Sequence, residues 1–366
     1  MNLGAPLLRW LTLLSPVCCC LFSARGILHF FQLESYQFPG YFRTLRRNWK
    51  RALLPGVTLA AYLTLLYLAY RSIDRILDMS VGKILLALVN AALAVAGGWW
   101  CRSIFQQKKA KKPFVVTMRV KRTYIVMGVV YTLLCTPIAL LTKVYFCGLL
   151  PLLLPLWVAL GGLLAWPIEK LVSEMYFRDA QKKLAARPDI IKIGITGSYG
   201  KTSTKFVLRD ILSQKYRVLA TPASFNTPMG LSRVINEQLK GEHQIFIAEM
   251  GARHVGDIKE LCDLVHPKYG LLTSVGPQHL ETFGSIENIA GTKYELIEAL
   301  PEDGIAFFSS DGSYVDRLFA KCEREKYRVG FNPDRQPYML ATDIEAGPQG
   351  SRFTLKCADG ESLRCR

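Results

Sequence analysis

Acidic residues are scarce in the first half of this 366-residue sequence. Residues 1–188 contain 24 Lys and Arg but only six Asp and Glu, whereas residues 189–366 contain 22 basic and 23 acidic residues. A nucleic-acid-binding protein is expected to carry its basic excess on a folded domain. Here the excess lies between apolar segments, which argues against that class and indicates loops beside a membrane with anionic lipids.

The sequence also lacks paired cysteines of the kind that bind zinc. Six of its ten cysteines lie in or beside apolar segments, and the other four are scattered through the second half without a C-x-x-C pair. Neither a zinc site nor a disulfide framework is therefore predicted.

Long hydrophobic runs are abundant in the first half. Four segments contain no charged residue, and each approaches or exceeds the roughly 20 residues that cross a bilayer; they are residues 52–70, 84–101, 124–142 and 146–168. A further stretch, residues 5–22, is interrupted by Arg9 and Pro16, and it is interpreted as a fifth span, an interfacial helix or a signal peptide. The signal peptide is the weakest of these interpretations, because a basic n-region is missing. Residues 1–168 are thus predicted to form an α-helical transmembrane region.

The loops between these segments predict the orientation of the chain. Residues 25–51 carry six basic residues, and residues 102–122 carry eight with no acid. Basic loops are retained on the cytoplasmic side, so the part of the chain after residue 168 is expected there too.

The pattern of the second half predicts an α/β domain. Apolar, strand-like runs at residues 190–195, 244–248, 269–275 and 304–308 alternate with helix-like stretches at residues 202–214, 256–265, 286–300 and 313–324. This alternation predicts a parallel sheet, followed by a strand hairpin over residues 339–364. Residues 169–188 have the pattern of a charged amphipathic helix, interpreted as a linker along the membrane surface.

The stretch GITGSYGKTST, residues 194–204, directly follows the first apolar strand. The chain turns through Gly197, Ser198, Tyr199 and Gly200 and then enters a helix, so that backbone N–H groups and a helix N-terminus converge. Such a point attracts phosphate, and the pattern predicts a P-loop that binds ATP.

The residues after this turn complete the predicted nucleotide site. Lys201 is expected to reach the β- and γ-phosphates, the Thr202 hydroxyl to hold Mg²⁺, and Ser203 to lie beside the nucleotide. The strict G-x-x-x-x-G-K-[ST] pattern fails at Ile195, where its first glycine should stand. A plain strand-to-helix turn with an exposed lysine is therefore the alternative.

The run GSYGKTST resembles the phosphate loop of the Mur ligases, ATP-dependent enzymes that add amino acids or dipeptides to peptidoglycan precursors. Their signature, G-[TS]-x-G-K-[TS]-x-[TS], does not need the earlier glycine. The resemblance continues in order through SFNTPMG, IAEMGARHVGDI, HPKYGLLTSVGPQHLETFGS and IAGTKYELI, between residues 224 and 297. It implies that residues 189–366 are a Mur ligase central domain, most similar to the members that add the terminal dipeptide.

Three residues are predicted to join Thr202 at a magnesium site. Glu249 ends an apolar strand, where a carboxylate emerges at the carboxyl edge of the sheet; the alternative is a solvated strand-end acid. The resemblance implies that His279 binds magnesium and that Lys293 reacts with carbon dioxide to form an anionic carbamate ligand. A packed or surface histidine and a solvated helix lysine are the alternatives.

Two further residues correspond to family positions near the substrates. Asn226 matches an asparagine near the acceptor substrate, although a turn former beside Pro228 is an equal interpretation. Asp311 matches an acid near the nucleotide, but Ser309 stands where the family has an asparagine that meets the adenine, which puts the adenine contact in doubt.

The resemblance implies an ATP-dependent amide ligase with Lys201, His279 and Lys293 as catalytic residues and with ATP and Mg²⁺ as cofactors. The acceptor carboxylate takes the γ-phosphoryl group, and an amino acid or a dipeptide such as D-Ala-D-Ala displaces phosphate. The location implied is the bacterial cytoplasmic membrane, with the domain on the cytoplasmic side.

The family pattern is incomplete at both ends. Membrane spans stand where a domain that grips the uridine nucleotide is expected, so the acceptor is predicted to be UDP-linked or lipid-linked. No residues remain for the third domain that closes over ATP, which predicts either a fragment or a partner chain that supplies it. The alternatives are a polyglutamate- or cyanophycin-type ligase and a non-catalytic, membrane-bound nucleotide-binding scaffold.

Overall fold

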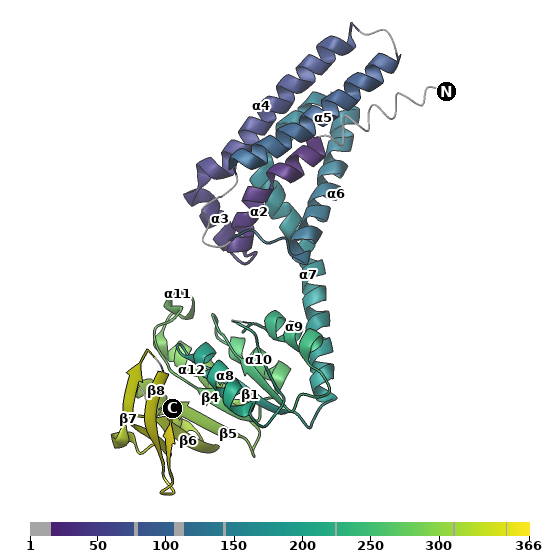
Figure 1. Cartoon of the computed structure of the whole chain (residues 1–366). Helices are drawn as coiled ribbons and strands as arrows, with labels where there is room; N and C mark the ends of the chain where they lie inside the picture. Colours follow the sequence, from purple (N-terminus) through teal and green to yellow (C-terminus); the bar gives the residue numbers. More distant parts are fainter. Residues whose placement is uncertain are drawn as a thin grey trace. The chain divides into compact units, whose positions relative to one another are not determined.

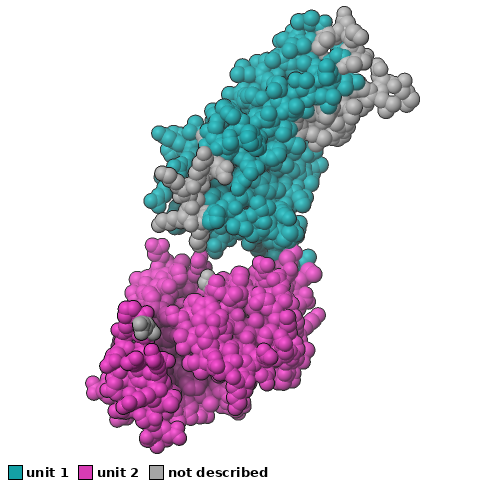
Figure 2. All heavy atoms as spheres, in the orientation of Figure 1, with its two compact units in different colours: residues 1–171 teal, residues 172–366 magenta. Residues whose placement is uncertain are grey.

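The computed structural model describes residues 16–76, 80–105, 113–141, 144–223, 225–309, 312–348 and 350–366. It divides into two compact units, Met1–Leu171 and Val172–Arg366 (Figure 2). Each unit is described by itself.

Unit 1 is helical. Its elements are α2 (Arg25–Leu33), α3 (Phe38–Arg47), α4 (Trp49–Asp74), α5 (Ser80–Phe105), α6 (Met118–Leu141), the 3-10 helix η1 (Val144–Leu153) and the first part of α7 (Leu154–Ala185) (Figure 1). Its core contains Phe31, Tyr41 and Leu63, whereas apolar side chains such as Leu65 and Leu133 point outward and are exposed. Apolar residues on the outer surface of a helix are typical of helices that face lipid.

Three helices of the described part are long and apolar enough to cross a membrane, namely Trp49–Ile73, Gly82–Ile104 and Leu149–Ala185. They contain the expected segments 52–70 and 84–101 and nearly all of 146–168. The expected segment 124–142 is helical in α6 as far as Leu141 and then runs into residues outside the described part. The expected stretch 5–22 lies largely outside it too; its described end is in a bent helix pair, Pro16–Ser23 and Arg25–Leu33.

Unit 2 is built on one nine-stranded sheet with the order β2-β3-β1-β4-β5-β6-β7-β8-β9. Its strands are β1 (Ile191–Thr196), β2 (Val218–Ala220), β3 (Ile245–Glu249), β4 (Tyr269–Leu272), β5 (Ile305–Ser309), β6 (Glu325–Gly330), β7 (Met339–Gly347), β8 (Gly350–Cys357) and β9 (Ser362–Cys365). Neighbouring strands from β2 to β7 are parallel, and β7, β8 and β9 are antiparallel. The predicted parallel sheet is thus present, and the strands of the predicted hairpin region extend the same sheet in antiparallel fashion.

Helices cover this sheet on both faces. They are α8 (Lys201–Leu212), α9 (Pro228–Gln238), α10 (Asp257–Val265), α11 (Leu280–Phe283), α12 (Ile286–Glu298) and α13 (Ser313–Lys321), with a 3-10 turn η2 (Pro333–Arg335). Side chains alternate along β3: Ile245 and Ile247 pack towards α8, whereas Phe246 and Ala248 belong to the larger core with α9, α10 and α12. Alternation with period two is what a strand buried on both faces requires.

Residues 169–185 of the expected linker helix are helical, and this helix does more than connect. It is the end of α7, and its residues Ala180 and Leu184 are buried in the larger core of unit 2. The same core extends to α12 and α13, so the end of α7 is an integral part of the α/β fold.

Candidate functional site

The predicted phosphate loop lies between β1 and α8, at the carboxyl edge of the sheet. Gly200 caps α8 with a left-handed backbone, φ 83°, which glycine adopts without steric cost. A Cβ atom on Gly197 would collide with the Thr273 hydroxyl and would lie 2.9 Å from the Ser274 nitrogen. The spacing of these two glycines therefore follows from the backbone path of the loop.

Residues that follow β4 hold this loop in place. The Ser198 N–H donates to the Ser274 carbonyl at 2.8 Å, and the Tyr199 N–H donates to the Ser274 hydroxyl at 2.8 Å. The Ser198 hydroxyl donates to the Gly276 carbonyl at 3.0 Å, and Ser198 is buried. These bonds fix the path of the loop relative to the end of β4. No local sequence pattern predicts these partners, because the bonded residues are about 75 positions apart.

Lys201 folds back over the loop that precedes it. Its Nζ donates to the Gly197 carbonyl at 2.6 Å. Burial lowers the pKa of Lys201, and the charge of Glu249 opposes that shift. The ammonium group is thus held at the mouth of the phosphate loop, whereas the Tyr199 ring and Ser203 are exposed.

Glu249 is the centre of a buried polar cluster. Its side chain is 1% exposed, and both its oxygens lie 3.0 Å from the Thr202 hydroxyl, which donates to them. Asn226 Nδ2 donates to Oε1 at 3.3 Å, and the buried Lys205 Nζ donates to Oε2 at 2.8 Å. The structure therefore brings together three predicted residues, Thr202, Glu249 and Asn226, and adds a fourth, Lys205.

The other two predicted metal ligands lie on the α11–α12 side of the loop. Lys293 is on α12 and 3% exposed, and burial, followed by the charge of Lys201, lowers its pKa to about 8. His279 precedes α11 in a left-handed conformation, φ 57°, and is exposed. Its pKa is lowered by partial burial and then by the charges of Arg253, Lys293 and Lys201. Lys201, His279 and Lys293 thus lie within electrostatic reach of one another.

The donor set suits a hard cation. A carboxylate and a hydroxyl, from Glu249 and Thr202, are the oxygen ligands that Mg²⁺ takes in nucleotide sites. No group of three or more His, Cys, Asp or Glu side chains able to hold a metal occurs within the described ranges, so a metal bound by protein side chains alone is not indicated there. Asp311 lies outside the described residues, and the predicted nucleotide contact at that position stays a prediction.

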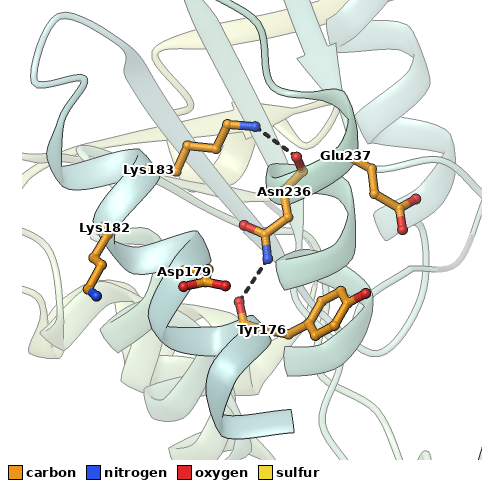
Figure 3. A pocket seen from close by; sticks show the side chains of 6 residues that line it. All are labelled: Tyr176, Asp179, Lys182, Lys183, Asn236 and Glu237. Carbon is orange, nitrogen blue, oxygen red and sulfur yellow. Dashed lines mark hydrogen bonds between the residues drawn. The ribbon is translucent and has the colours of Figure 1, made fainter. Parts of the chain in front are cut away.

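A separate pocket lies between the end of α7 and α9 (Figure 3). Lys183 Nζ donates to the carbonyl oxygens of Ile235 at 3.1 Å and Asn236 at 2.8 Å, and Asn236 Nδ2 donates to the Tyr176 carbonyl at 2.9 Å. These bonds fasten α7 to the C-terminal end of α9. The pocket contains none of the predicted site residues, and its contacts support a structural role.

Part of this chain is similar to proteins of a known family. Residues 195–366 match the model of the Mur ligase middle domain. The UDP-N-acetylmuramoyl-tripeptide--D-alanyl-D-alanine ligase of Bacillus subtilis is 33% identical over 164 residues, which are 45% of this chain and 35% of the relative. The ligase of the same name from Mycobacterium leprae is 40% identical over 174 residues, 46% of this chain and 34% of the relative.

Solved structures give a similar partial match. The MurF ligase of Thermotoga maritima in complex with ADP has 30% sequence identity and a TM-score of 0.47, covering 52% of this chain and 44% of that one. A MurF structure from Acinetobacter baumannii has 26% identity and a TM-score of 0.48, with 52% and 42% covered. The chain spans about a third of the length of the curated relatives that it matches.

Proposed function

Residues 195–366 match the Mur ligase middle domain, and from this premise we propose that the chain is a membrane-bound, ATP-dependent amide ligase of peptidoglycan precursor synthesis. The observation that carries the proposal is the contact between Thr202 and Glu249 beside the phosphate loop. It joins the residue that opens α8 to the end of a neighbouring strand, where an open α/β sheet binds its ligand.

The nucleotide would be bound by the loop and the start of α8. The backbone N–H groups of residues 197–202 and the positive end of the helix suit the phosphates of ATP. Lys201 would move from the Gly197 carbonyl to the β- and γ-phosphates. Thr202 and Glu249 would hold Mg²⁺, which supplies charge neutralisation on the transferred group.

His279 and Lys293 would complete the site on its far side. A pKa of about 8 leaves roughly a tenth of the Lys293 amines neutral at pH 7, far more than an ordinary lysine with a pKa of 10.5. Only the neutral amine reacts with carbon dioxide, and the carbamate that forms replaces a cation with an anion. His279, with its lowered pKa, would be neutral and able to act as a ligand.

The reaction proposed is carboxylate activation. A carboxylate oxygen of the acceptor attacks the γ-phosphorus, the bond to the leaving ADP oxygen breaks, and an acyl phosphate forms. An amine then attacks the acyl carbon, phosphate leaves, and the amine loses a proton to give the amide. The protein contributes alignment and electrostatic stabilisation, with Asn226 orienting the acceptor.

The acceptor proposed is a muramoyl tripeptide and the donor a dipeptide such as D-Ala-D-Ala. The two similar ligases from Bacillus subtilis and Mycobacterium leprae are named for these substrates. The three apolar helices support a location in the bacterial cytoplasmic membrane, and this location favours a lipid-linked acceptor over a UDP-linked one.

The first test measures binding and the first half-reaction with the full chain in lipid nanodiscs. Calorimetry measures ATP binding with Mg²⁺, and hydroxylamine traps an acyl phosphate as a hydroxamate. We expect ADP and hydroxamate to form only when ATP, Mg²⁺ and a tripeptide acceptor are all present, and Lys201→Met to abolish both. ATP binding without ADP release, even with candidate partner chains added, would favour a non-catalytic scaffold.

A second test identifies the substrates. Lipid-linked and UDP-linked tripeptide acceptors are compared, each with D-Ala-D-Ala or glutamate as the amine. Activity with UDP-linked acceptors alone would overturn the lipid-linked assignment. Activity with glutamate on a folate or polymer acceptor would instead indicate a polyglutamate-type ligase.

A further inference from the structure

Lys205 is a fully buried lysine beside the candidate nucleotide site, and nothing in the proposed reaction uses it. Its side chain is 0% exposed, although a lysine is rarely buried completely. It lies on α8 three residues after Thr202, so both side chains are on the same face of the helix. That face is directed towards the end of β3.

The ammonium group of Lys205 contacts two different elements. Nζ lies 2.8 Å from Glu249 Oε2, at the end of β3, and it also donates to the Ala223 carbonyl in the loop between β2 and α9. Asn226, in the same loop, donates to the other oxygen of Glu249. One lysine therefore links α8, the carboxylate and the loop that carries Asn226.

The loop needs such a link because its backbone is strained. Ala223 has φ 44°, in the left-handed region that residues with a side chain rarely adopt. Further along, the Asn226 carbonyl accepts from the Gly251 N–H at 3.0 Å, and a Cβ on Gly251 would lie 2.7 Å from the Asn226 side chain. The position of Asn226 thus depends on contacts from outside its own loop.

Stability alone is a weak explanation for this ion pair. Removing two charges from water costs about as much as their attraction returns, so an apolar pair of the same volume would serve a core equally well. An ion pair fixes direction, however, because a charged carboxylate with one oxygen bound keeps the other in a defined orientation.

We propose that Lys205 is a positioning residue that holds the Glu249 carboxylate, Ala223 and Asn226 in one arrangement, and so couples the cation site to the acceptor side. The inference rests on the proposed function, since it deepens the role of Glu249 as a cation ligand. Lys205 binds Oε2, and Oε1, which accepts from Thr202 and Asn226, is the oxygen that would bind the cation.

The test compares Lys205→Met with the unaltered full chain in nanodiscs. Calorimetry measures the dissociation constant of ADP with and without Mg²⁺, and hydrogen exchange measures the protection of amides 225–227 without any nucleotide. The ratio of the dissociation constant without Mg²⁺ to that with Mg²⁺ gives the factor by which Mg²⁺ strengthens ADP binding. We expect this factor to fall by about 10- to 100-fold in the variant, the range typical of residues that orient a metal ligand. Mg²⁺-free ADP binding should stay within about twofold, and amides 225–227 should exchange faster. Lys205→Arg, which keeps the cation, should recover part of the Mg²⁺ effect.

Lys326→Met is the matched control. Lys326 is partly buried, and its Nζ donates to the carbonyl oxygens of Phe319 at 2.9 Å and Cys322 at 2.7 Å, at the end of α13. The Lys326→Met variant should be less stable, but the Mg²⁺ dependence of its ADP binding and the exchange of amides 225–227 should not change.

If Lys205→Met does not fold, as judged by circular dichroism, Lys205→Gln replaces it in both measurements. Unchanged Mg²⁺ dependence together with unchanged exchange would overturn the proposal. If the unaltered chain binds no nucleotide, the proposed function fails, and the exchange comparison still tests the positioning role.

Discussion

The hydroxyl oxygen of Thr202 lies 3.0 Å from both carboxylate oxygens of Glu249. The two residues are 47 positions apart and meet because β1 and β3 are adjacent parallel strands, with Ile195 paired to Glu249. Both residues therefore stand at the same edge of the sheet. This contact between the start of α8 and the end of β3 brings together the two oxygen-bearing side chains that are proposed to hold Mg²⁺.

Thr202→Ala and Glu249→Gln should weaken the Mg²⁺ dependence of nucleotide binding by at least about tenfold each, because the first removes an oxygen ligand of the cation and the second removes the negative charge of another ligand. Residues that act on one ion are not additive, so the double variant should lose little more than the Glu249→Gln variant. Calorimetric titration of ADP with and without Mg²⁺ measures the effect. Additive losses in the double variant would mean that the two residues act independently.

Lys201→Met should reduce ATP affinity by on the order of 2 kcal/mol, about 30-fold, because it removes a charge-assisted hydrogen bond to phosphate. The fold should be unaffected, since the bonds from Ser198 and Tyr199 to Ser274 hold the loop without Lys201. The exposed Lys259→Met is the control, and equal ATP affinity in both variants would remove Lys201 from the site.

Gly197→Ala should destabilise the protein by on the order of 2 kcal/mol and abolish nucleotide binding, because the added methyl group collides with the Thr273 hydroxyl. Gly291→Ala is the matched control: Gly291 lies within α12 with no atom within 4 Å of an added Cβ. That substitution should raise stability by about 0.5 to 1 kcal/mol, since alanine favours a helix interior. Thermal unfolding measures both changes. A Gly197→Ala variant that binds ATP normally would show that the loop tolerates a different path.

The stability of unit 2 should depend on pH through Lys293, whose pKa falls from 10.5 to about 8 on folding. Between pH 8 and 10.5 the unfolded chain binds a proton that the folded chain has released, so stability rises with pH in this window. The destabilisation is complete below pH 8 and disappears above 10.5. Lys293→Met should therefore stabilise the protein by up to about 3 kcal/mol at pH 7 and by much less at pH 10.5.

Thermal unfolding of Mg²⁺-free protein in buffers without carbon dioxide measures this difference, because a carbamate would remove the lysine charge. Lys259→Met, an exposed change on α10, should show no such pH dependence. If Lys293→Met raises the stability of the protein equally at both pH values, the cause is better packing and not the removal of a buried charge.

Much of unit 2 was predictable from local patterns. The strands β1, β3, β4 and β5 and the helices α8, α10, α12 and α13 all begin and end within three residues of the predicted bounds. The strand β2, with three residues, and the strand β6, with its charged residues, were missed, since neither has a continuous apolar run. The helix α9 was also missed, because the motif that contains Asn226 was interpreted as a substrate contact or a turn and not as the start of a helix.

The candidate site was predictable only in part. The glycines of the loop and the pair Lys201-Thr202 carry a spacing pattern that local backbone geometry imposes. Glu249 could be placed because a strand-end acid points to the edge of the sheet. Lys205 carries no such signal: its position three residues after Thr202 puts it on the right helix face, but a lysine there is expected in solvent.

The sequence by itself determined the local features of this protein: the apolar segments long enough to cross a membrane, the alternation of strands and helices, and the turn that leads from β1 into α8. Each of these depends on side chains that are near neighbours in the chain. Only the tertiary structure decided which distant residues meet. The strand order brings β3 and β4 to either side of β1. This places Glu249 against Thr202 and Lys205, and it fastens the phosphate loop to Ser274. Such contacts follow from the packing of whole elements, whose register is fixed by burial on both faces of the sheet.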